Sequence, residues 1–207
     1  MLGVYVTVPI ACFRKGLARE YLETEPLPPP ATCYGFLLSL VGETDRKKYI
    51  GCRVAPVLLS KPPTSVVLRT LWRVKKTPLG SPGNTRPDYQ QLLSDVELVI
   101  WLDSAIELED RVRDALLNPA SVARFGGLSL GESTHMIDEV SLLDRVRNRL
   151  PKTGRAFLHR EDKFGPLTLP VWVDHVGSSG TRYATGALED LPLAPPPTDR
   201  MPRISPN

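Results

Sequence analysis

Cysteine, histidine and long apolar runs are all scarce in this chain of 207 residues, which has three cysteines and three histidines. Cys12, Cys33 and Cys52 lie far apart without a Cys-x-x-Cys pair, so the sequence indicates neither a disulfide framework nor a zinc site. No apolar run approaches the roughly 20 residues of a membrane span, and the N-terminus lacks the layout of a secretion signal. These absences predict a protein of the reducing cytoplasm that has no membrane partner, metal or other cofactor.

Acidic residues are missing from one long stretch. Between Arg46 and Pro87 there are ten basic residues and no acid, so all 23 aspartates and glutamates lie elsewhere. Charge that serves only solubility is usually mixed in sign, and the segregation therefore favours a polyanionic partner over a solvated basic face. Trp72 and Tyr49 lie within the run, and aromatic rings among cations are typical of nucleic-acid binding.

A proline run introduces the clearest helical pattern. Residues 28–30 are all proline and keep the preceding chain extended, so we expect a helix over 31–41 with Thr32 as its N-cap. Gly42 then supplies the stop. The residues expected to face the core are Phe36, Leu37, Leu40 and Val41.

Alternating apolar residues predict strands on both sides of this helix. The order strand, helix, two strands, strand, helix, strand indicates an α+β fold with a ferredoxin-like (RRM-like) βαββαβ core. The last of these strands, at 136–142, would complete the sheet. The other elements are expected at 2–10, 31–41, 49–60, 65–76, 96–102 and 107–117.

An arm and extra strands are expected outside this core. Residues 61–64 carry two prolines and are read as a hairpin turn, from which a basic arm at about 61–95 projects, with a mobile tip at 77–87. Strands at 156–159 and 167–173 would extend the sheet. We therefore expect one domain over 1–190, followed by a proline-rich tail at 191–207 that is extended or disordered.

Residues 126–133 form a glycine-rich loop that has several interpretations. It has Walker spacing, but Glu132 occupies the lysine position and would repel a triphosphate. Gly127 to Gly131 also fits the G-x-S-x-G elbow of a serine esterase, with Ser129 as nucleophile, His159 or His175 as base and Asp162 or Asp174 as orienting acid, although the flanking pattern is poor. We prefer a cradle of backbone amides for RNA phosphates, with a plain tight turn as the alternative.

Three of these segments, in this order, carry a resemblance to a known family. They are the first strand running into Phe13-Arg14-Lys15, the helix start Pro28-Pro29-Pro30-Ala31-Thr32-Cys33-Tyr34-Gly35-Phe36-Leu37-Leu38, and the late loop Leu130-Gly131-Glu132-Ser133. The set resembles the Cas-five family of the CRISPR-associated RAMP superfamily over about two-thirds of the chain. The resemblance implies a subunit that caps the 5′ handle of guide RNA (crRNA) in a type I CRISPR surveillance complex (Cascade), where the arm presses on the RNA.

The resemblance also implies partners. These are the backbone RAMP subunits and the large subunit of Cascade, with target DNA reached indirectly because guide RNA pairs with it. The CRISPR subtype, and the choice between antiviral defence and RNA-guided transposition with transposition proteins, stay open. The residues expected to bind RNA are Arg14, Lys15, Arg19, Tyr34, Arg69, Trp72, Arg73, Lys75, Lys76, Arg86, Arg124, Gly126, Gly127, Ser129, Gly131 and Ser133.

Catalysis is not expected. One subtype of the resembled family cuts precursor guide RNA without metal by means of a tyrosine and a Lys-His pair, but no histidine here follows a lysine. His135 comes directly after the loop and is the candidate general base. We predict a non-catalytic binding subunit and keep metal-independent endoribonuclease and serine esterase as the alternatives.

Overall fold

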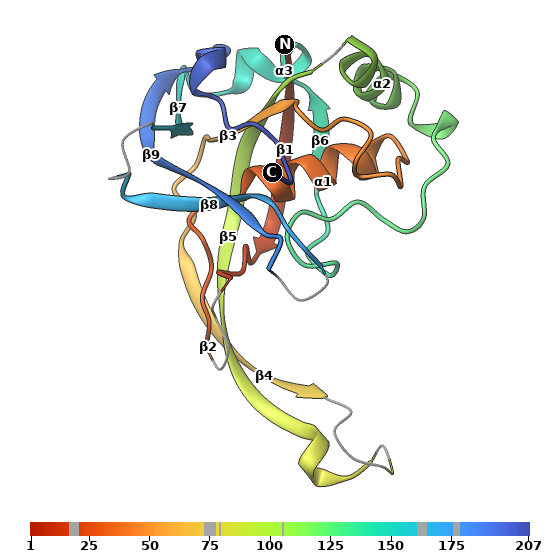
Figure 1. Ribbon diagram of the computed structural model, residues 1–207, viewed down its shortest axis with the longest axis vertical. Helices are drawn as coiled ribbons and strands as arrows, with labels where there is room; N and C mark the ends of the chain where they lie inside the picture. Colours follow the sequence, from red (N-terminus) through yellow and green to blue (C-terminus); the bar gives the residue numbers. More distant parts are fainter. Residues whose placement is uncertain (17–20, 73–77, 79, 105, 161–164, 176–178) are drawn as a thin grey trace.

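A mixed sheet organises the chain (Figure 1). The computed structural model describes residues 1–207 except 17–20, 73–77, 79, 105, 161–164 and 176–178. Among the described residues the strand order is β6-β1-β5-β3-β7-β9-β8, and β2 and β4 each pair with β5. Only the β2–β5 pair is parallel in this set, so the sheet is largely antiparallel, and the expected α+β class is confirmed. The strands are β1 (Leu2–Ala11), β2 (Tyr21–Leu22), β3 (Arg53–Leu58), β4 (Thr64–Trp72), β5 (Thr85–Asp103), β6 (Glu139–Leu142), β7 (Thr153–His159), β8 (Leu167–Trp172) and β9 (Arg182–Pro192).

Strand β5 is the spine of the molecule. Its second half pairs with β1 on one edge and with β3 on the other, so that Ile100 lies between Val4 and Pro56. Its first half pairs with β4, from Thr85 opposite Trp72 to Leu93 opposite Thr64. Strands β3 and β4 therefore pair with different parts of β5. They do not pair with each other, so the prediction of a hairpin between them at 61–64 is wrong.

The change of partner happens at a backbone irregularity. Asp95 has φ +53°, a left-handed conformation that aspartate tolerates better than most residues. The Ser60 hydroxyl donates to the Asp95 carbonyl at 3.0 Å and accepts the Glu97 amide at 3.1 Å. These bonds replace strand pairing at the point where β3 gives way to β4.

Beyond this point β4 and residues 85–93 form a two-stranded hairpin, which we call the arm, that extends away from the body (Figure 1). Pro82–Asn84 is a short 3₁₀ turn at its end. Residues 85–87 belong to β5, so this part of the tip that was expected to be irregular is a strand. Residues 77 and 79 lie outside the described residues.

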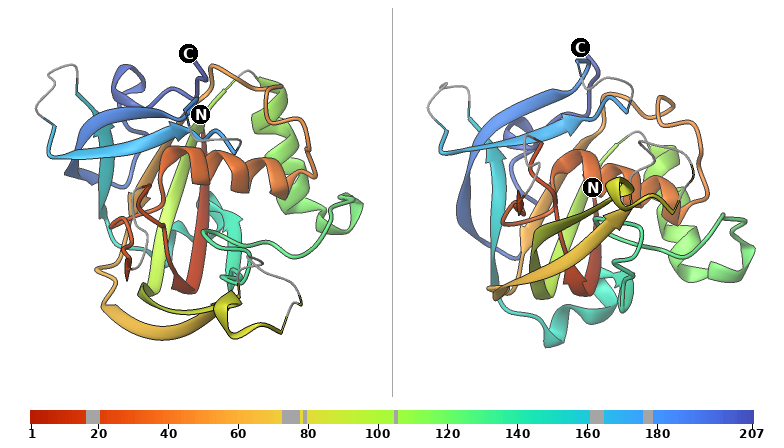
Figure 2. Two further views of the ribbon diagram at one scale, coloured as in Figure 1. Left: turned by 60° about the horizontal axis from the view of Figure 1, so that its bottom comes forward. Right: turned by 90° about the horizontal axis from the view of Figure 1, so that it is seen from below.

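Two helices cover one face of the sheet. α1 (Pro30–Leu40) and α2 (Ile106–Leu117) bury Leu37, Leu40, Leu108 and Val112 against the alternate residues of the strands. Helix α1 also contacts β8, because the second half of the sheet curls round it (Figure 2). No described helix combines the length and apolar character that membrane crossing requires.

The start of α1 differs from the expectation. Pro29 is the N-cap and Pro30 the first helical residue, and no side chain caps the helix, so the assignment of Thr32 as N-cap is wrong. Proline suits the first turn because its φ is already helical and its missing N–H has no partner to lose there. Gly42 has φ +67° and ends the helix as expected.

The opposite face of the sheet is covered by α3 (Leu143–Val146) and by the residues after β9. Leu193 and Met201 are buried in this layer, whereas the buried Ile204 belongs to the core on the α1 face and exchanges backbone hydrogen bonds with Gly51 and Cys52. The tail is thus extended, one of the two expectations, but it is packed and not disordered. Strand β9 was not foreseen, although the strands expected near 156–159 and 167–173 are present as β7 and β8.

Substitution by alanine should have opposite effects on stability at Gly35, within α1, and at Gly42, just after its end. A Cβ on Gly42 would lie 2.3 Å from the Ala123 carbonyl oxygen at a positive φ, whereas a Cβ on Gly35 meets nothing within 4 Å. We expect Gly42→Ala to lower the free energy of unfolding by more than ~1 kcal/mol and Gly35→Ala to raise it by ~0.5–1 kcal/mol. Urea denaturation of both variants measures this, and a Gly42→Ala variant as stable as wild type would contradict the close contact.

Candidate nucleic-acid interface

A groove runs between α1, the segment 123–131 and the end of β8. Its volume is about 790 Å³. Small residues of α1 line one side, since Thr32, Gly35 and Ser39 recur at helical spacing. We call it the α1 groove. The groove is also lined by Tyr34, Glu43, Arg46, Arg124, Phe125, Ser129, Gly131, Trp172, Val173 and His175.

Near β8, the wall of the groove is formed by an arginine stacked on a tryptophan ring. The guanidinium of Arg46 lies 4.1 Å from the centre of the Trp172 ring and donates to the Val173 carbonyl at 2.5 Å. The Tyr34 hydroxyl donates to the Arg46 carbonyl at 2.8 Å. Tyr34 is 3% exposed, and burial raises the pKa of its hydroxyl. Although Tyr34 borders the groove, its buried ring positions Arg46 and is not presented for stacking, contrary to the expectation.

An acid at the groove is neutralised by cations from other elements. The Glu43 carboxylate accepts from Arg111 at 2.7 Å and from Lys48 at 3.3 Å. The hydrogen bond from Arg111 is the main reason that the pKa of Glu43 falls to about 2. The negative charge of Glu43 at the groove is therefore compensated by these two cations.

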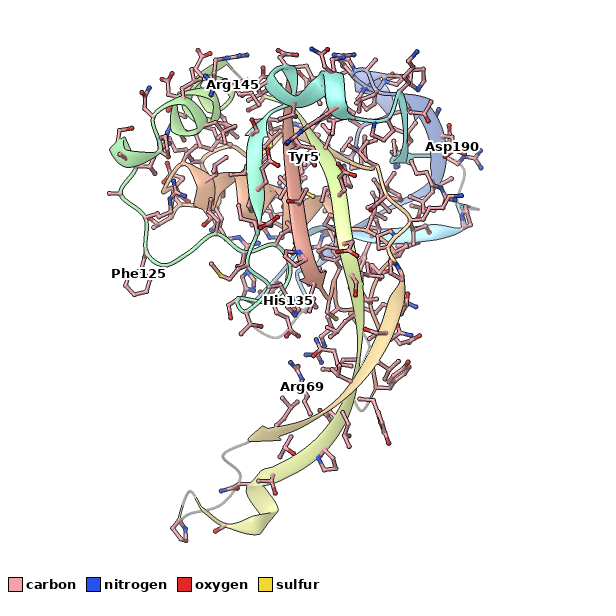
Figure 3. The ribbon with its side chains drawn as sticks, turned by 180° about the vertical axis from the view of Figure 1, so that it is seen from behind. Tyr5, Arg69, Phe125, His135, Arg145 and Asp190 are labelled. Atoms are coloured by element: carbon pink, nitrogen blue, oxygen red, sulfur yellow. The ribbon has the colours of Figure 1, made fainter. Side chains whose placement is uncertain are left out.

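The glycine-rich loop presents one side of the groove and packs its other side against β1. Gly131 has φ +105°, and a Cβ there would lie 2.9 Å from the Cys12 carbonyl oxygen, so this glycine is required by packing. Gly126 has open space around it. Phe125 is fully exposed and points away from the body (Figure 3). Arg124 is half-buried, while Gly126, Gly127 and Ser133 are exposed.

His135 fixes this loop to the core. Its Nδ1 accepts the Cys12 amide and the Glu132 amide, both at 3.2 Å, so the ring proton is carried by Nε2. The ring is buried, and burial lowers the pKa of His135. A base must offer a free nitrogen lone pair, and that of Nδ1 is already used by two donors. The role of His135 here is to hold the loop.

The root of the arm joins the loop through ion pairing. Arg69 on β4 points toward the loop (Figure 3) and donates to Glu132 through both terminal nitrogens, at 3.1 and 3.4 Å. Gln90 on β5 donates to the same carboxylate at 2.9 Å. Arg86 pairs with Asp88 at 2.5 Å. Two of the arginines expected to bind RNA therefore already contact acids of the chain.

Acids from outside the basic run reach it elsewhere too. Lys48 pairs with Glu43 and Glu107. The stretch between Arg46 and Pro87 contains no acid in the sequence, but in the folded protein acids from other segments lie beside it. The reason is that β-sheet pairing and loop packing bring together residues that are far apart in the chain.

The remaining expected contacts fall into two groups. At the end of β1, Arg14 is exposed and Lys15 pairs with Glu23 at 3.4 Å. Arg19, Arg73, Lys75 and Lys76 lie outside the described residues, as does the side chain of Trp72.

The esterase elbow is not formed at Ser129. An elbow places its serine on a sharp turn between a strand and a helix, whereas Ser129 forms an isolated bridge with Met136 and neither flanking segment is a strand or a helix of the described chain. His159 bonds the Thr185 carbonyl, and Asp174 accepts the Gly180 amide. The described residues include no group of three or more His, Cys, Asp or Glu side chains placed to bind a metal ion.

Sequence reasoning missed the contribution of β8 and the role of Glu132. Arg46 and Trp172 are far apart in the chain, and no local pattern links them. In the sequence, Glu132 indicates only that a triphosphate is disfavoured at the loop. The contact between Glu132 and Arg69 depends on the direction in which the arm extends from the body.

Comparisons with known proteins give a consistent picture. No family model matches the chain. It is 54% identical over 212 residues to the CRISPR-associated protein Cas5 of Myxococcus xanthus (strain DK1622), covering 99% of this chain and 97% of that protein. A chain of a CRISPR RNA-guided surveillance complex is similar with TM-score 0.62 and 16% identity, covering 92% of this chain and 89% of the other. A crystal structure of a Cas protein is similar with TM-score 0.53 and 16% identity, covering 100% of this chain and 99% of the other.

Titration of His135 should make stability depend on pH. The folded state lowers its pKa, so the unfolded chain binds a proton more readily, and stability is lost as pH falls below the unfolded value of about 6.5. We expect His135→Asn, which keeps an acceptor without a titrating group, to lose less stability than wild type between pH 7 and pH 5. Denaturant titrations at both pH values measure the difference, and equal losses would contradict it.

Proposed function

The chain belongs to the Cas5 family of CRISPR-associated proteins, and from that premise we propose that it binds the 5′ handle of guide RNA in a type I CRISPR surveillance complex. The observation that carries the proposal is the α1 groove, which is bordered by the glycine-rich loop and lies beside the root of the arm. The fold that it shares with a chain of an RNA-guided surveillance complex supports membership of such an assembly.

We assign the core to the ferredoxin-like class. The order β1, α1, β3, β5, α2, β6 follows the βαββαβ pattern once the arm is set aside. The spatial order β6-β1-β5-β3 supports this, because the last strand lies beside the first and the third lies between the first and the second. RNA-recognition modules use this core, and the arm would be an insertion between its second and third strands.

The groove suits single-stranded RNA. Its glycine and small hydroxyl residues on α1 let a strand approach closely, and unpaired bases need apolar surface on which to lie. Phe125 offers an exposed ring for stacking, and Arg124 beside it offers charge for a phosphate. The backbone at Gly126 and Gly127 is exposed, which fits the amide cradle.

We propose protein partners for the outer face of the arm. Val66, Leu68, Tyr89 and Tyr21 are exposed there, whereas the charged residues Arg69 and Arg86 lie on the other face. An apolar face attracts a protein surface more than a polyanion. The backbone subunits or the large subunit of the complex would cover it, and target DNA would be reached through base pairing with the guide. Either defence or transposition, with its own partner proteins, is compatible with this arrangement.

Another part of the proposal is that the chain does not cut RNA. The arrangement of His135, with two amides on Nδ1, supports a structural role for the residue whose place beside the loop made it the candidate base. We expect precursor guide RNA that is incubated with the purified chain in a chelating buffer to keep its full length on a denaturing gel. A discrete product that disappears in a His135→Asn variant would establish the endoribonuclease alternative instead.

Purification of the chain together with the products of its neighbouring genes tests the binding role. We expect guide RNA and other subunits to co-purify, and sequencing to find the 5′ end of the RNA protected. Gly35→Trp should remove the RNA at unchanged stability, because the new ring would fill the groove. Leu117→Trp, a neutral change at an exposed position of α2 outside the groove, is the matched control. RNA retained by Gly35→Trp would contradict the groove as the site.

A further inference from the structure

Glu132 lies where three separate segments meet. On the arm side, its carboxylate accepts two hydrogen bonds from Arg69 and one from Gln90. In the strand register Val67 faces Gln90 and Arg69 faces Asp88, so Arg69 and Gln90 share the face of the arm that looks toward the loop. A single carboxylate thus engages both strands of the arm.

The other side of Glu132 is tied to the core. Its backbone amide donates to Nδ1 of His135, which also holds the Cys12 amide at the end of β1. Leu130, two residues earlier, is completely buried and donates its amide to the His135 carbonyl at 3.0 Å. The loop that presents Glu132 to the arm is therefore rigidly anchored.

The charge of Glu132 needs an explanation. A carboxylate next to a surface that binds a polyanion weakens binding by repulsion, so a site built only from attraction would not contain one. Its contacts are stronger than those of an ordinary surface pair, since Arg69 binds through both terminal nitrogens and Gln90 is 2% exposed.

We propose that Glu132 is a positioning residue for RNA binding, holding Arg69 and the root of the arm against the glycine-rich loop so that the two RNA-gripping surfaces meet at a fixed angle. This inference rests on the proposed function for its RNA readout. It deepens that function, because it makes the arm ordered at its root before RNA arrives and assigns the ordering to one side chain.

Affinity for guide RNA gives a test in which the two explanations differ in sign. If Glu132 merely repels RNA, Glu132→Gln removes a negative charge and frees Arg69 for a phosphate, so binding tightens and its salt dependence steepens. If Glu132 positions the arm, the same change weakens binding although it makes the protein more positive. We expect a loss of roughly tenfold, the size typical of removing one charge-assisted contact.

Two further variants separate positioning from other effects. The double variant Arg69→Glu with Glu132→Arg exchanges the charges and should recover part of the affinity lost in either single variant. Glu189→Gln is the matched control, because Arg200 holds Glu189 through both terminal nitrogens in the same manner, away from the arm. It should leave RNA affinity within about twofold of wild type.

The angle of the arm can be measured without RNA. Spin labels on cysteines introduced at the exposed positions Leu68 and Ile50 report the distance from arm to body, and the native cysteines are buried and should not react. We expect a narrow distance distribution in wild type, a broad one in Glu132→Gln and a narrow one in the charge-exchange variant.

These measurements separate the two claims. Wild-type protein that binds no guide RNA would overturn the proposed function, while the distance distributions would still test Glu132. Tighter or unchanged RNA binding by Glu132→Gln, or an arm that stays equally narrow in its distribution, would overturn the positioning role.

Discussion

The hydrogen-bond ladder of β5 is the constraint on which the rest of the molecule depends. One strand of 19 residues is shared by the core, through β1 and β3, and by the arm, through β4. Because the strand is continuous, a tilt of the arm bends the ladder near Asp95, where Ser60 supplies substitute hydrogen bonds. A two-stranded ribbon alone is only marginally stable in water, so the strand pairing of the arm depends on this continuity, while the angle of the arm is what we propose Glu132 fixes through Arg69. The groove and the arm are consequently parts of one framework.

Electrostatics at the candidate interface depends on pairing more than on composition. Arg69, Arg86 and Lys48 all belong to the stretch without acids, yet each contacts a carboxylate from the same fold. An arginine that is already paired contributes geometry to a binding site, because its charge is largely compensated before a phosphate arrives. The same logic applies to Glu43, whose negative charge at the groove is balanced by Arg111.

Local patterns in the sequence were sufficient for the helices and the central strands. The apolar spacing of α1 and α2, the glycine at position 42 and the alternation in β1 each depend on neighbours within one or two turns of chain. The hairpin expected at 61–64 was wrong because its two strands look adjacent in sequence, and only the length of β5 reveals that they pair with different parts of it. The groove wall formed by Arg46 and Trp172, and the contact of Glu132 with Arg69, could not be foreseen because they join segments that no periodicity connects. The ordered set of motifs did identify the family, since it reads several local signals together.

The packed tail has a consequence for the order in which the molecule is made. Arg53 at the start of β3 donates to the carbonyl of Met201, 148 positions further along the chain, and Cys52 accepts the amide of Ile204. On the ribosome, β3 would emerge long before these partners are translated, and the apolar side of β3 that lies away from α1 would stay exposed to water until Leu193 and Met201 follow. The tail can therefore cover that face of β3 only late in synthesis. Until then, the nascent chain exposes an apolar surface to which chaperones or other unfinished chains can bind.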